Sequence, residues 1–458
     1  MDFVFSDPPP PEPPRRAAIR DAHLLPEAEA DAQILAAADL PAEARERIAA
    51  TARRLVIAVR RERHGKGGLD AFLQEYALSS PEGVALMCLA EALLRIPDAD
   101  TIDRLIRDKI APESNGVDWQ RHLGHSGSLF VNASTWALML TGRLLRPDRG
   151  APDLAGVLRR FVARSSEPVW RQAVTAAMRI LADQFIMGRT IEQALHRADN
   201  AERQGYRHSF DMLGEAAHTA ADAERYRAAY QRAIAAIGRA AAGRPIEEAP
   251  GISVKLSALH PRYEMAQRER VMAELVPSLL DLAEQARSAG IGFTIDAEEA
   301  DRLELSLDIV ETLALAPELS GWDGFGLAVQ AYQKRALPLV AWLADLAARA
   351  GRRLMVRLVK GAYWDSEIKR AQERGLDSYP VFTRKVATDV SYLACARRMF
   401  AAGPLFYPQF ATHNAHTLAA VLELAGGRED WEFQRLHGMG EALYDQIVGP
   451  DGMNRPCR

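Results

Sequence analysis

The chain has 458 residues, of which 48% are hydrophobic and 26% are charged, so its composition is that of a globular protein with more than one core. The formal net charge of −4 gives no overall basic field, which argues against wholesale binding to a nucleic-acid backbone. Three cysteines without a CxxC spacing support neither a disulfide framework nor a zinc cage, and a reducing cytosol fits best. The N-terminus lacks the layout of a signal peptide, and no apolar run approaches the roughly 18–20 residues of a membrane span.

The first part of the chain reads as a tail followed by helices. The run Pro8 to Pro14, broken only by Glu12, cannot donate backbone hydrogen bonds and predicts an extended, mobile segment. From about residue 31 to residue 110 apolar residues recur at helical spacing, and further helices are expected over 128–145 and 168–187. We therefore expect a tail and N-terminal arm over 1–50 and an all-helical domain without catalytic chemistry over 51–204.

After about residue 205 short apolar or β-branched runs alternate with long amphipathic helices, which is typical of consecutive βα units. Seven strands are expected, over Ser209–Glu215, Ile252–Leu256, Gly292–Asp296, Gly326–Gln330, Leu354–Val359, Leu405–Phe410 and Glu432–His437. Crossover helices are expected over Ala220–Ala242, Arg270–Ala289, Glu298–Leu315, Arg335–Ala350 and Phe382–Ala402. Such connections require the strands to be parallel.

The number of units favours a closed (βα)8-type, TIM-like barrel of the α/β class over residues 205–458 rather than an open sheet. After the seventh strand a short helix over Gly440–Val448 leads to Arg458, where an eighth strand should begin. The sequence therefore predicts a barrel that lacks its eighth unit, preceded by an all-helical region.

Polar residues follow every expected strand, where the active sites of such barrels lie. They are Asp211, Glu215, Lys255, Asp296, Gln330, Arg357, Lys360, Thr412, His413, Asn414, Gln434 and His437. Singly, each is more often a solvated rim residue or part of a structural ion pair, but seven strands ending this way favour a shared ligand site. Lys255, Arg357, Lys360 and Lys385 facing Asp211 and Asp296 would suit an anionic ligand.

The same region favours a phosphate-bearing cofactor. Gly361 and the helix start at Thr412–Asn414 could approach phosphate oxygens through backbone N–H groups. Tyr363 and Trp364 offer flat faces that could stack on a ring, although aromatic residues after a strand are as often packing residues.

Three other motifs were weighed. His413 and His416 have an i, i+3 spacing but no third ligand at a suitable distance in sequence, so no metal site is expected. The segment 438–443 mimics a dinucleotide fingerprint, but its third glycine is missing, and we interpret it as a chance match. Lys255 or Lys360 could instead be the Schiff-base lysine of a barrel aldolase.

At these residues the sequence closely resembles a known family, the proline dehydrogenase region of the bifunctional flavoprotein proline utilisation A. The resemblance runs through SFDMLGEAA (209–217), GISVKLSALHPRYE (251–264), IDAEEADRLELSLD (295–308), QAYQKR (330–335), VRLVKGAYWDSEIKRAQ (356–372), YPQFATHNAHT (407–417) and FQRLHGMGEALY (433–444). It reaches back through LSSPEGVALMCLAEALLRIPD (78–98) and SLFVNASTWALML (128–140). Motifs of this length are highly specific.

The resemblance implies a distorted barrel with non-covalent FAD that oxidises L-proline to Δ1-pyrroline-5-carboxylate in the cytoplasm and passes electrons to a membrane quinone. It implies catalytic roles for Lys255, Asp296, Arg357 and Tyr363, and substrate contacts for Asp211, Lys255, Tyr363 and Leu436. The cofactor would be held by Asp296, Ala297, Gln330, Arg357, Val359, Lys360, Gly361, Ala362, Tyr363, Trp364, Thr383, Lys385, Thr388, Thr412, His413, Asn414, Gln434 and Leu436.

The sequence also departs from the family pattern. The longest members begin with a small ribbon-helix-helix domain, and nothing before Asp31 can form one, so we expect no DNA binding. The eighth strand, the final helix that grips the substrate carboxylate and the aldehyde dehydrogenase half are not in this sequence. The alternative to a working enzyme is therefore a flavin-binding fragment without turnover.

Overall fold

A computed structural model describes residues 13–62, 186–213, 216–449 and 452–458. The chain divides into two compact units, the first made of Met1–Val56, Thr190–Arg435 and Leu443–Arg458, and the second of Ile57–Arg189 and Leu436–Ala442. The account below concerns the first unit. The helices expected over 128–145 and over most of 168–187 lie outside the described residues.

The centre of the first unit is a seven-stranded sheet in which all neighbours are parallel and follow the order of the sequence. The strands are β1 (Ser209–Asp211), β2 (Gly251–Val254), β3 (Gly292–Ile295), β4 (Phe325–Gln330), β5 (Leu354–Val359), β6 (Phe406–Ala411) and β7 (Glu432–Gln434). The prediction of a barrel of βα units is confirmed. Two strands are shorter than expected by more than one residue, since β1 ends at Asp211 and β7 at Gln434. Glu215 lies outside the described residues.

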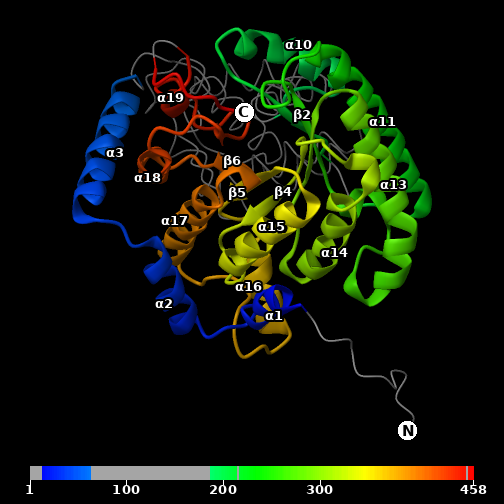
Figure 1. Ribbon diagram of the computed structural model, residues 1–458, viewed down its shortest axis with the longest axis horizontal. Coiled ribbons are helices and arrows are strands. Elements are labelled where there is room, and N and C mark those ends of the chain that lie inside the picture. The colour runs from blue at the N-terminus through cyan, green and yellow to red at the C-terminus, as the bar shows by residue number, and fades with distance from the viewer. Residues whose placement is uncertain (1–12, 63–185, 214–215, 450–451) are drawn as a thin grey trace, which may run out of the picture. The chain divides into compact units, whose positions relative to one another are not determined.

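The described helices are α1 (Pro14–Asp21), α2 (Glu27–Ala38), α3 (Ala42–Glu62), α10 (Ile191–Glu202), α11 (Ala220–Ala241), α12 (Leu256–Leu259), α13 (Arg268–Ser288), α14 (Leu303–Ala314), α15 (Ala336–Ala350), α16 (Trp364–Glu373), α17 (Lys385–Ala401), α18 (Ala415–Ala425) and α19 (Glu441–Tyr444). Figure 1 shows α11, α13, α14, α15 and α17 on the outside of the curved sheet. Their buried faces are apolar, whereas the strands are buried on both sides.

The first long crossover helix, α11, begins at a complete capping box. The Thr219 hydroxyl accepts a hydrogen bond from the Asp222 N–H at 3.1 Å, and the Asp222 carboxylate accepts one from the Thr219 N–H at 3.0 Å. Thr219→Ala should therefore lower the free energy of unfolding by about 1 kcal/mol. Urea denaturation measures this value, with Thr312→Ala, an exposed threonine within α14, as a control that should change little.

The residues just before Arg458 lie between the last strand of the sheet, β7, and the segment that precedes the first strand, β1. Cys457 forms a parallel bridge with Phe433 of β7 and another with Tyr206, which precedes β1. Hydrogen bonds run from the Arg207 N–H to the Cys457 carbonyl at 2.7 Å and from the Arg458 N–H to the Phe433 carbonyl at 2.8 Å. The N-terminal ends of β7 and β1 are thereby joined.

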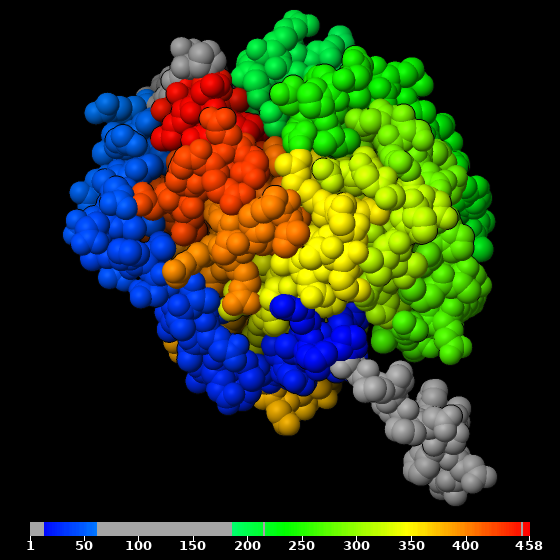
Figure 2. Space-filling view, in the orientation of Figure 1, coloured from blue at the N-terminus to red at the C-terminus, as the bar shows by residue number. Residues whose placement is uncertain are grey.

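Helices α1 to α3 form an N-terminal arm, defined here as residues 14–52, that lies along the outer helices. In Figures 1 and 2 the arm, in blue, passes over α15 and α17, and the contacts of α1 with α15 and of α2 with α17 agree with this view. Ile48 and Ala52 of α3 pack on Ala419 and Ala420 of α18.

The start of the arm differs from the prediction in one respect. Most of the expected extended run lies outside the described residues; Pro13 precedes α1, and Pro14 is the first residue of this helix. Proline is well tolerated at the first helical position because its missing N–H would have no partner there. Helix α3 is continuous across residue 50, and the domain boundaries at 50 and 204 stay predictions.

Candidate functional site

Four charged side chains from four strand ends meet inside the barrel. The Lys255 ammonium group lies 2.6 and 2.8 Å from the two carboxylate oxygens of Asp211 and 3.1 Å from Oδ2 of Asp296. The other oxygen of Asp296 accepts a hydrogen bond from Nη1 of Arg357 at 2.7 Å. Asp296 therefore links the two cations, and the set alternates in sign as Asp211, Lys255, Asp296 and Arg357. We call these four residues the central cluster.

Arg357 reaches across the barrel from β5. Its Nη2 donates to the Ser253 hydroxyl on β2 at 2.9 Å and to the Ser209 hydroxyl on β1 at 3.2 Å. Its Nε is buried and has no hydrogen-bond partner among the described residues. Because a buried guanidinium N–H without a partner is costly, this atom is available for a ligand that offers an acceptor.

Tyr230, which was not predicted from the sequence, contacts the central cluster through Lys255. This tyrosine is fully buried on α11, and its hydroxyl accepts a hydrogen bond from the backbone N–H of Lys255 at 3.2 Å. Burial raises the pKa of Tyr230, so the hydroxyl stays neutral. In the sequence, Tyr230 is one of several residues on the apolar face of an amphipathic helix. No neighbouring motif distinguishes it as a functional residue.

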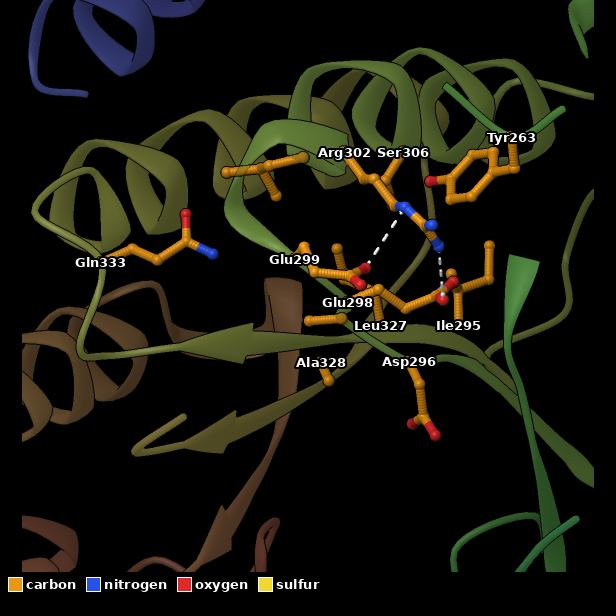
Figure 3. Close-up of a pocket in the computed structure, with 12 residues that line it drawn as sticks. Tyr263, Ile295, Asp296, Glu298, Glu299, Arg302, Ser306, Leu327, Ala328 and Gln333 are labelled. Atoms are coloured by element: carbon orange, nitrogen blue, oxygen red, sulfur yellow. Dashed lines mark hydrogen bonds and ion pairs between the residues drawn. The ribbon is translucent and has the colours of Figure 1, made fainter. Parts of the chain in front are cut away.

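A small pocket lies on the other side of β3, between the strand and α14. Figure 3 shows Arg302, Glu298 and Glu299 gathered there, with Asp296 directed away from them toward the barrel interior. Arg302 lies 3.0 Å from Oε2 of Glu298 and 3.2 Å from Oε2 of Glu299. The charges that line this pocket pair with one another, whereas the central cluster contains a buried guanidinium N–H without a partner among the described residues.

Glu298 ties two of the strand ends together. Its Oε1 accepts a hydrogen bond from the Ser257 N–H, two residues after Lys255, at 3.0 Å. Burial raises the pKa of Glu298, while the hydrogen bonds from Ser257 and the charge of Arg302 act in the opposite direction. The pairing fixes the loop after Asp296 against the segment after Lys255.

Lys360 and Lys385 do not join the central cluster, contrary to the prediction. Nζ of Lys360 lies 2.5 Å from Oδ1 of Asp389, and Nζ of Lys385 lies 3.0 Å from Oδ2 of the same residue. Burial lowers the pKa of Lys360 and raises that of Asp389, but hydrogen bonds from both lysines outweigh burial and leave the pKa of Asp389 lowered. Asp389 was not predicted as a site residue because it lies on helix α17 rather than at the end of a strand.

The two lysines lie beside the start of α18. Lys360 also donates to the Thr417 hydroxyl at 3.2 Å, and Asn414 caps α18 by accepting from the Thr417 N–H at 2.9 Å. Burial lowers the pKa of the neighbouring His413, helped by the charges of Arg435 and Lys360. Of the residues expected to hold the phosphates and adenosine, Lys385 and Thr388 lie on α17, and Thr412, His413 and Asn414 lie between β6 and α18. Thr383 precedes α17 by two residues, and Lys360 directly follows β5.

Gly361 is a glycine for a packing reason. Its φ is 135°, a region open only to glycine, and an added Cβ would lie 2.5 Å from the ring of Tyr332. Gly361→Ala should therefore lower the free energy of unfolding by about 2 kcal/mol or more, measured by urea denaturation. Gly375→Ala, with φ of 61° and open space around the added Cβ, is the matched control and should cost about 1 kcal/mol.

The other candidates fall into three groups. Val359, Ala362, Tyr363 and Trp364 follow one another from the end of β5 into α16, and the indole of Trp364 donates to the Phe382 carbonyl. Gln330 is buried at the end of β4 and donates to the Ala297 carbonyl, while Gln434 donates to Glu432. Thr383 is bonded to Glu27 of the arm, and Leu436 belongs to the second unit.

Comparison with known families agrees with this arrangement. Residues 194–458, which carry the whole sheet and the central cluster, match the model of the proline dehydrogenase family. The chain belongs to the proline dehydrogenase family. The resemblance seen in the motifs is confirmed, and residues 14–60, which include the arm, match a second model described as the proline utilization A proline dehydrogenase N-terminal domain.

Relatives of this proline dehydrogenase family member include bifunctional proteins much longer than the chain. The chain is 56% identical over 452 residues to the bifunctional protein PutA of Escherichia coli K12, covering 97% of this chain and 34% of that protein. It is 52% identical to PutA of Rhizobium meliloti, covering 99% and 36%. A crystal structure of the D778Y mutant of proline utilization A (PutA) from Bradyrhizobium japonicum aligns with a TM-score of 0.71 at 49% identity, covering 99% of this chain and 44% of that one. The chain thus spans about a third of the length of the curated relatives it matches.

One prediction is wrong. Residues 68–185 match a model described as the DNA-binding domain of proline dehydrogenase, which contradicts the expectation of no DNA binding. A ribbon-helix-helix domain was expected only before Asp31, whereas the match lies in the segment interpreted as helical and without chemistry. Residues 68–185 lie outside the described part of the structure.

Proposed function

We propose that the chain catalyses the oxidation of L-proline to Δ1-pyrroline-5-carboxylate with FAD as cofactor. The observation that carries this proposal is the central cluster, in which a buried lysine and a half-buried arginine share one carboxylate near the ends of parallel strands. Such a site offers a fixed cation to the carboxylate of an amino acid and a second cation to an electron-accepting ring.

The described residues fit a flavin nucleotide in two respects. The partnerless Nε of Arg357 offers a donor inside the barrel, where an acceptor on the flavin ring could be bound. Lys360, Lys385 and the first turn of α18 offer cations and backbone donors for phosphates. When bound, FAD supplies the two-electron acceptor that proline oxidation requires.

The chain's own residues bind and orient in this proposal. Lys255 pairs with the proline carboxylate, and Asp211 and Asp296 hold the lysine in place and balance its charge. Asp296 also fixes the guanidinium of Arg357, whose positive charge stabilises negative charge that develops beside it. Tyr363 forms a wall of the substrate site. The hydride leaves C5 of proline when the proline amine is neutral.

A Schiff-base role for Lys255 or Lys360 finds no support in these contacts. A lysine nucleophile must be neutral, whereas the ammonium group of Lys255 touches two carboxylates and that of Lys360 touches Asp389.

The finer features of the proposal rest on the family resemblance. We propose a quinone as the electron acceptor and the cytoplasm, with a peripheral contact to the inner membrane, as the location. Within the described residues, none of the helices combines the length and the hydrophobicity of a membrane span.

The deciding experiment is anaerobic reduction of the bound flavin. Purified protein should be yellow, and L-proline added without oxygen should bleach the flavin absorbance, whereas glycine should not. A flavin-loaded protein that L-proline leaves yellow would favour the alternative of a flavin-binding fragment without turnover.

A further inference from the structure

The N-terminal arm contributes a carboxylate to the loop that precedes α17. Glu27, the first residue of α2, accepts a hydrogen bond from the Thr383 N–H at 2.9 Å. It also accepts the Thr383 hydroxyl, with Oγ1 lying 2.9 Å from Oε1 and 2.8 Å from Oε2. Both hydrogen-bond donors of Thr383 are therefore used by one residue of the arm, 356 positions away in the sequence.

The residues on either side strengthen this contact. Nζ of Lys334 and the hydroxyl of Ser378 both donate to the carbonyl of Leu25, at 2.8 and 3.3 Å. Farther along, Arg397 of α17 donates to the carbonyls of Ala37 and Asp39. Helix α2 thus lies along α17 with hydrogen bonds at both ends, an arrangement visible in Figure 1.

On its inner side the same loop is held by residues of the candidate cofactor site. The Phe382 N–H donates to the Tyr332 carbonyl at 2.8 Å, and the Trp364 indole donates to the Phe382 carbonyl at 2.9 Å. Helix α17 begins two residues after Thr383 with Lys385, and its first turns carry Asp389, the partner of Lys360. A displacement of Thr383 would move the helix start and with it this set of charges.

We infer that Glu27 is a positioning residue for the cofactor site. By accepting both donors of Thr383 it fixes the start of α17 and so sets where Lys385 and Asp389 meet Lys360. While the arm is in place, Thr383 has no donor left for a phosphate oxygen. The phosphates of the nucleotide are therefore bound by Lys360, Lys385 and the start of α18. This inference rests on the proposed function, because it concerns the site of the proposed flavin nucleotide.

The test is the affinity of the apoprotein for FAD, measured by quenching of flavin fluorescence. Glu27→Ala should weaken binding about tenfold, the effect expected from losing hydrogen bonds to a charged acceptor. Glu27→Gln keeps an oxygen at the position that accepts both Thr383 donors and should restore most of the affinity. Glu29→Ala, an exposed glutamate in the same turn of α2, should change nothing.

A second control separates positioning from general stability. Arg16 anchors the arm elsewhere, through Glu304 and Asp308 of α14, each at 2.9 Å. Arg16→Ala should lower the melting temperature but leave the FAD affinity near that of the unaltered protein. Equal losses of affinity in Arg16→Ala and Glu27→Ala, or no loss in Glu27→Ala, would overturn the inference.

Hydrogen exchange distinguishes a failure of the inference from a failure of the proposed function. In the cofactor-free protein, Glu27→Ala should speed amide exchange over residues 382–390 about tenfold, whereas Glu29→Ala should not. If the unaltered protein binds no FAD, the proposed function fails, but this exchange result still decides whether Glu27 fixes the start of α17.

Discussion

Replacing Lys255 with methionine should reduce kcat/KM for L-proline at least about a hundredfold while FAD remains bound. Among the described residues, the Lys255 ammonium group is the cation that lies between Asp211 and Asp296, so its loss leaves these carboxylates facing an incoming substrate carboxylate. The two aspartate carboxylates would then repel the substrate carboxylate. Methionine keeps roughly the length of the lysine side chain but removes its charge. Steady-state kinetics together with the flavin absorbance of the purified variant measure both effects.

Two controls make the result specific to the site. Lys369→Met removes an exposed lysine of α16 that pairs only loosely with Glu373, at 3.7 Å, and should leave kcat/KM unchanged. Tyr230→Phe keeps Lys255 but removes the acceptor of its backbone N–H, so it should cause a smaller loss, about tenfold. Full activity in Lys255→Met would rule out a role for this lysine in substrate binding.

The barrel could be predicted because its signal is repetitive. Short buried strands such as Gly251–Val254 and Gly292–Ile295 carry apolar or β-branched residues on both faces, and each is followed by a long amphipathic helix. The end of β1 was placed too late because the apolar residues Met212 and Leu213 follow its last paired residue. The end of β7 was also placed too late, although the charged Arg435 directly follows its last paired residue. Pairing with a neighbour, rather than composition, decides where such a strand ends.

The central cluster was predictable for the same reason. The carboxyl ends of parallel strands lie at one end of a barrel, so Lys255, Asp296 and Arg357 had to come close together. The pairing of Lys360 and Lys385 with Asp389 could not be predicted in this way, because Asp389 lies on α17. In the sequence it cannot be distinguished from the other polar residues on the surface of that helix. Glu27 and Thr383 meet through the docking of α2, which no local pattern in the sequence encodes.

The missed DNA-binding segment has another cause. Low overall charge and the lack of one known motif were used to exclude a function, although a segment of a large chain can carry a function that the whole-chain charge does not reveal. The match over residues 68–185 shows that the motifs noticed at 78–98 and 128–140 belonged to that segment.

The second large effect is expected at the N-terminal end of the barrel. Glu432 is fully buried at the start of β7, and one of its oxygens accepts from Nε of Arg458 at 2.8 Å and from the amides of Gln409 and Gln434. Arg207 lies 3.5 Å from the other oxygen. Glu432→Gln removes the negative charge between two cations and should lower the free energy of unfolding by about 3–5 kcal/mol, as measured by urea denaturation.

A surface pair provides the comparison. Glu311→Gln breaks the contact of Glu311 with Arg349 at 2.6 Å, where both side chains are partly exposed, and should cost no more than about 1 kcal/mol. The double variant Glu432→Leu with Arg458→Met should be less destabilised than the sum of the two single changes, because neither buried charge then lacks its partner. If Glu432→Gln costs no more than Glu311→Gln, solvent rather than Glu432 balances the charge of Arg458, and the join between β7 and the segment before β1 must depend on its backbone hydrogen bonds alone.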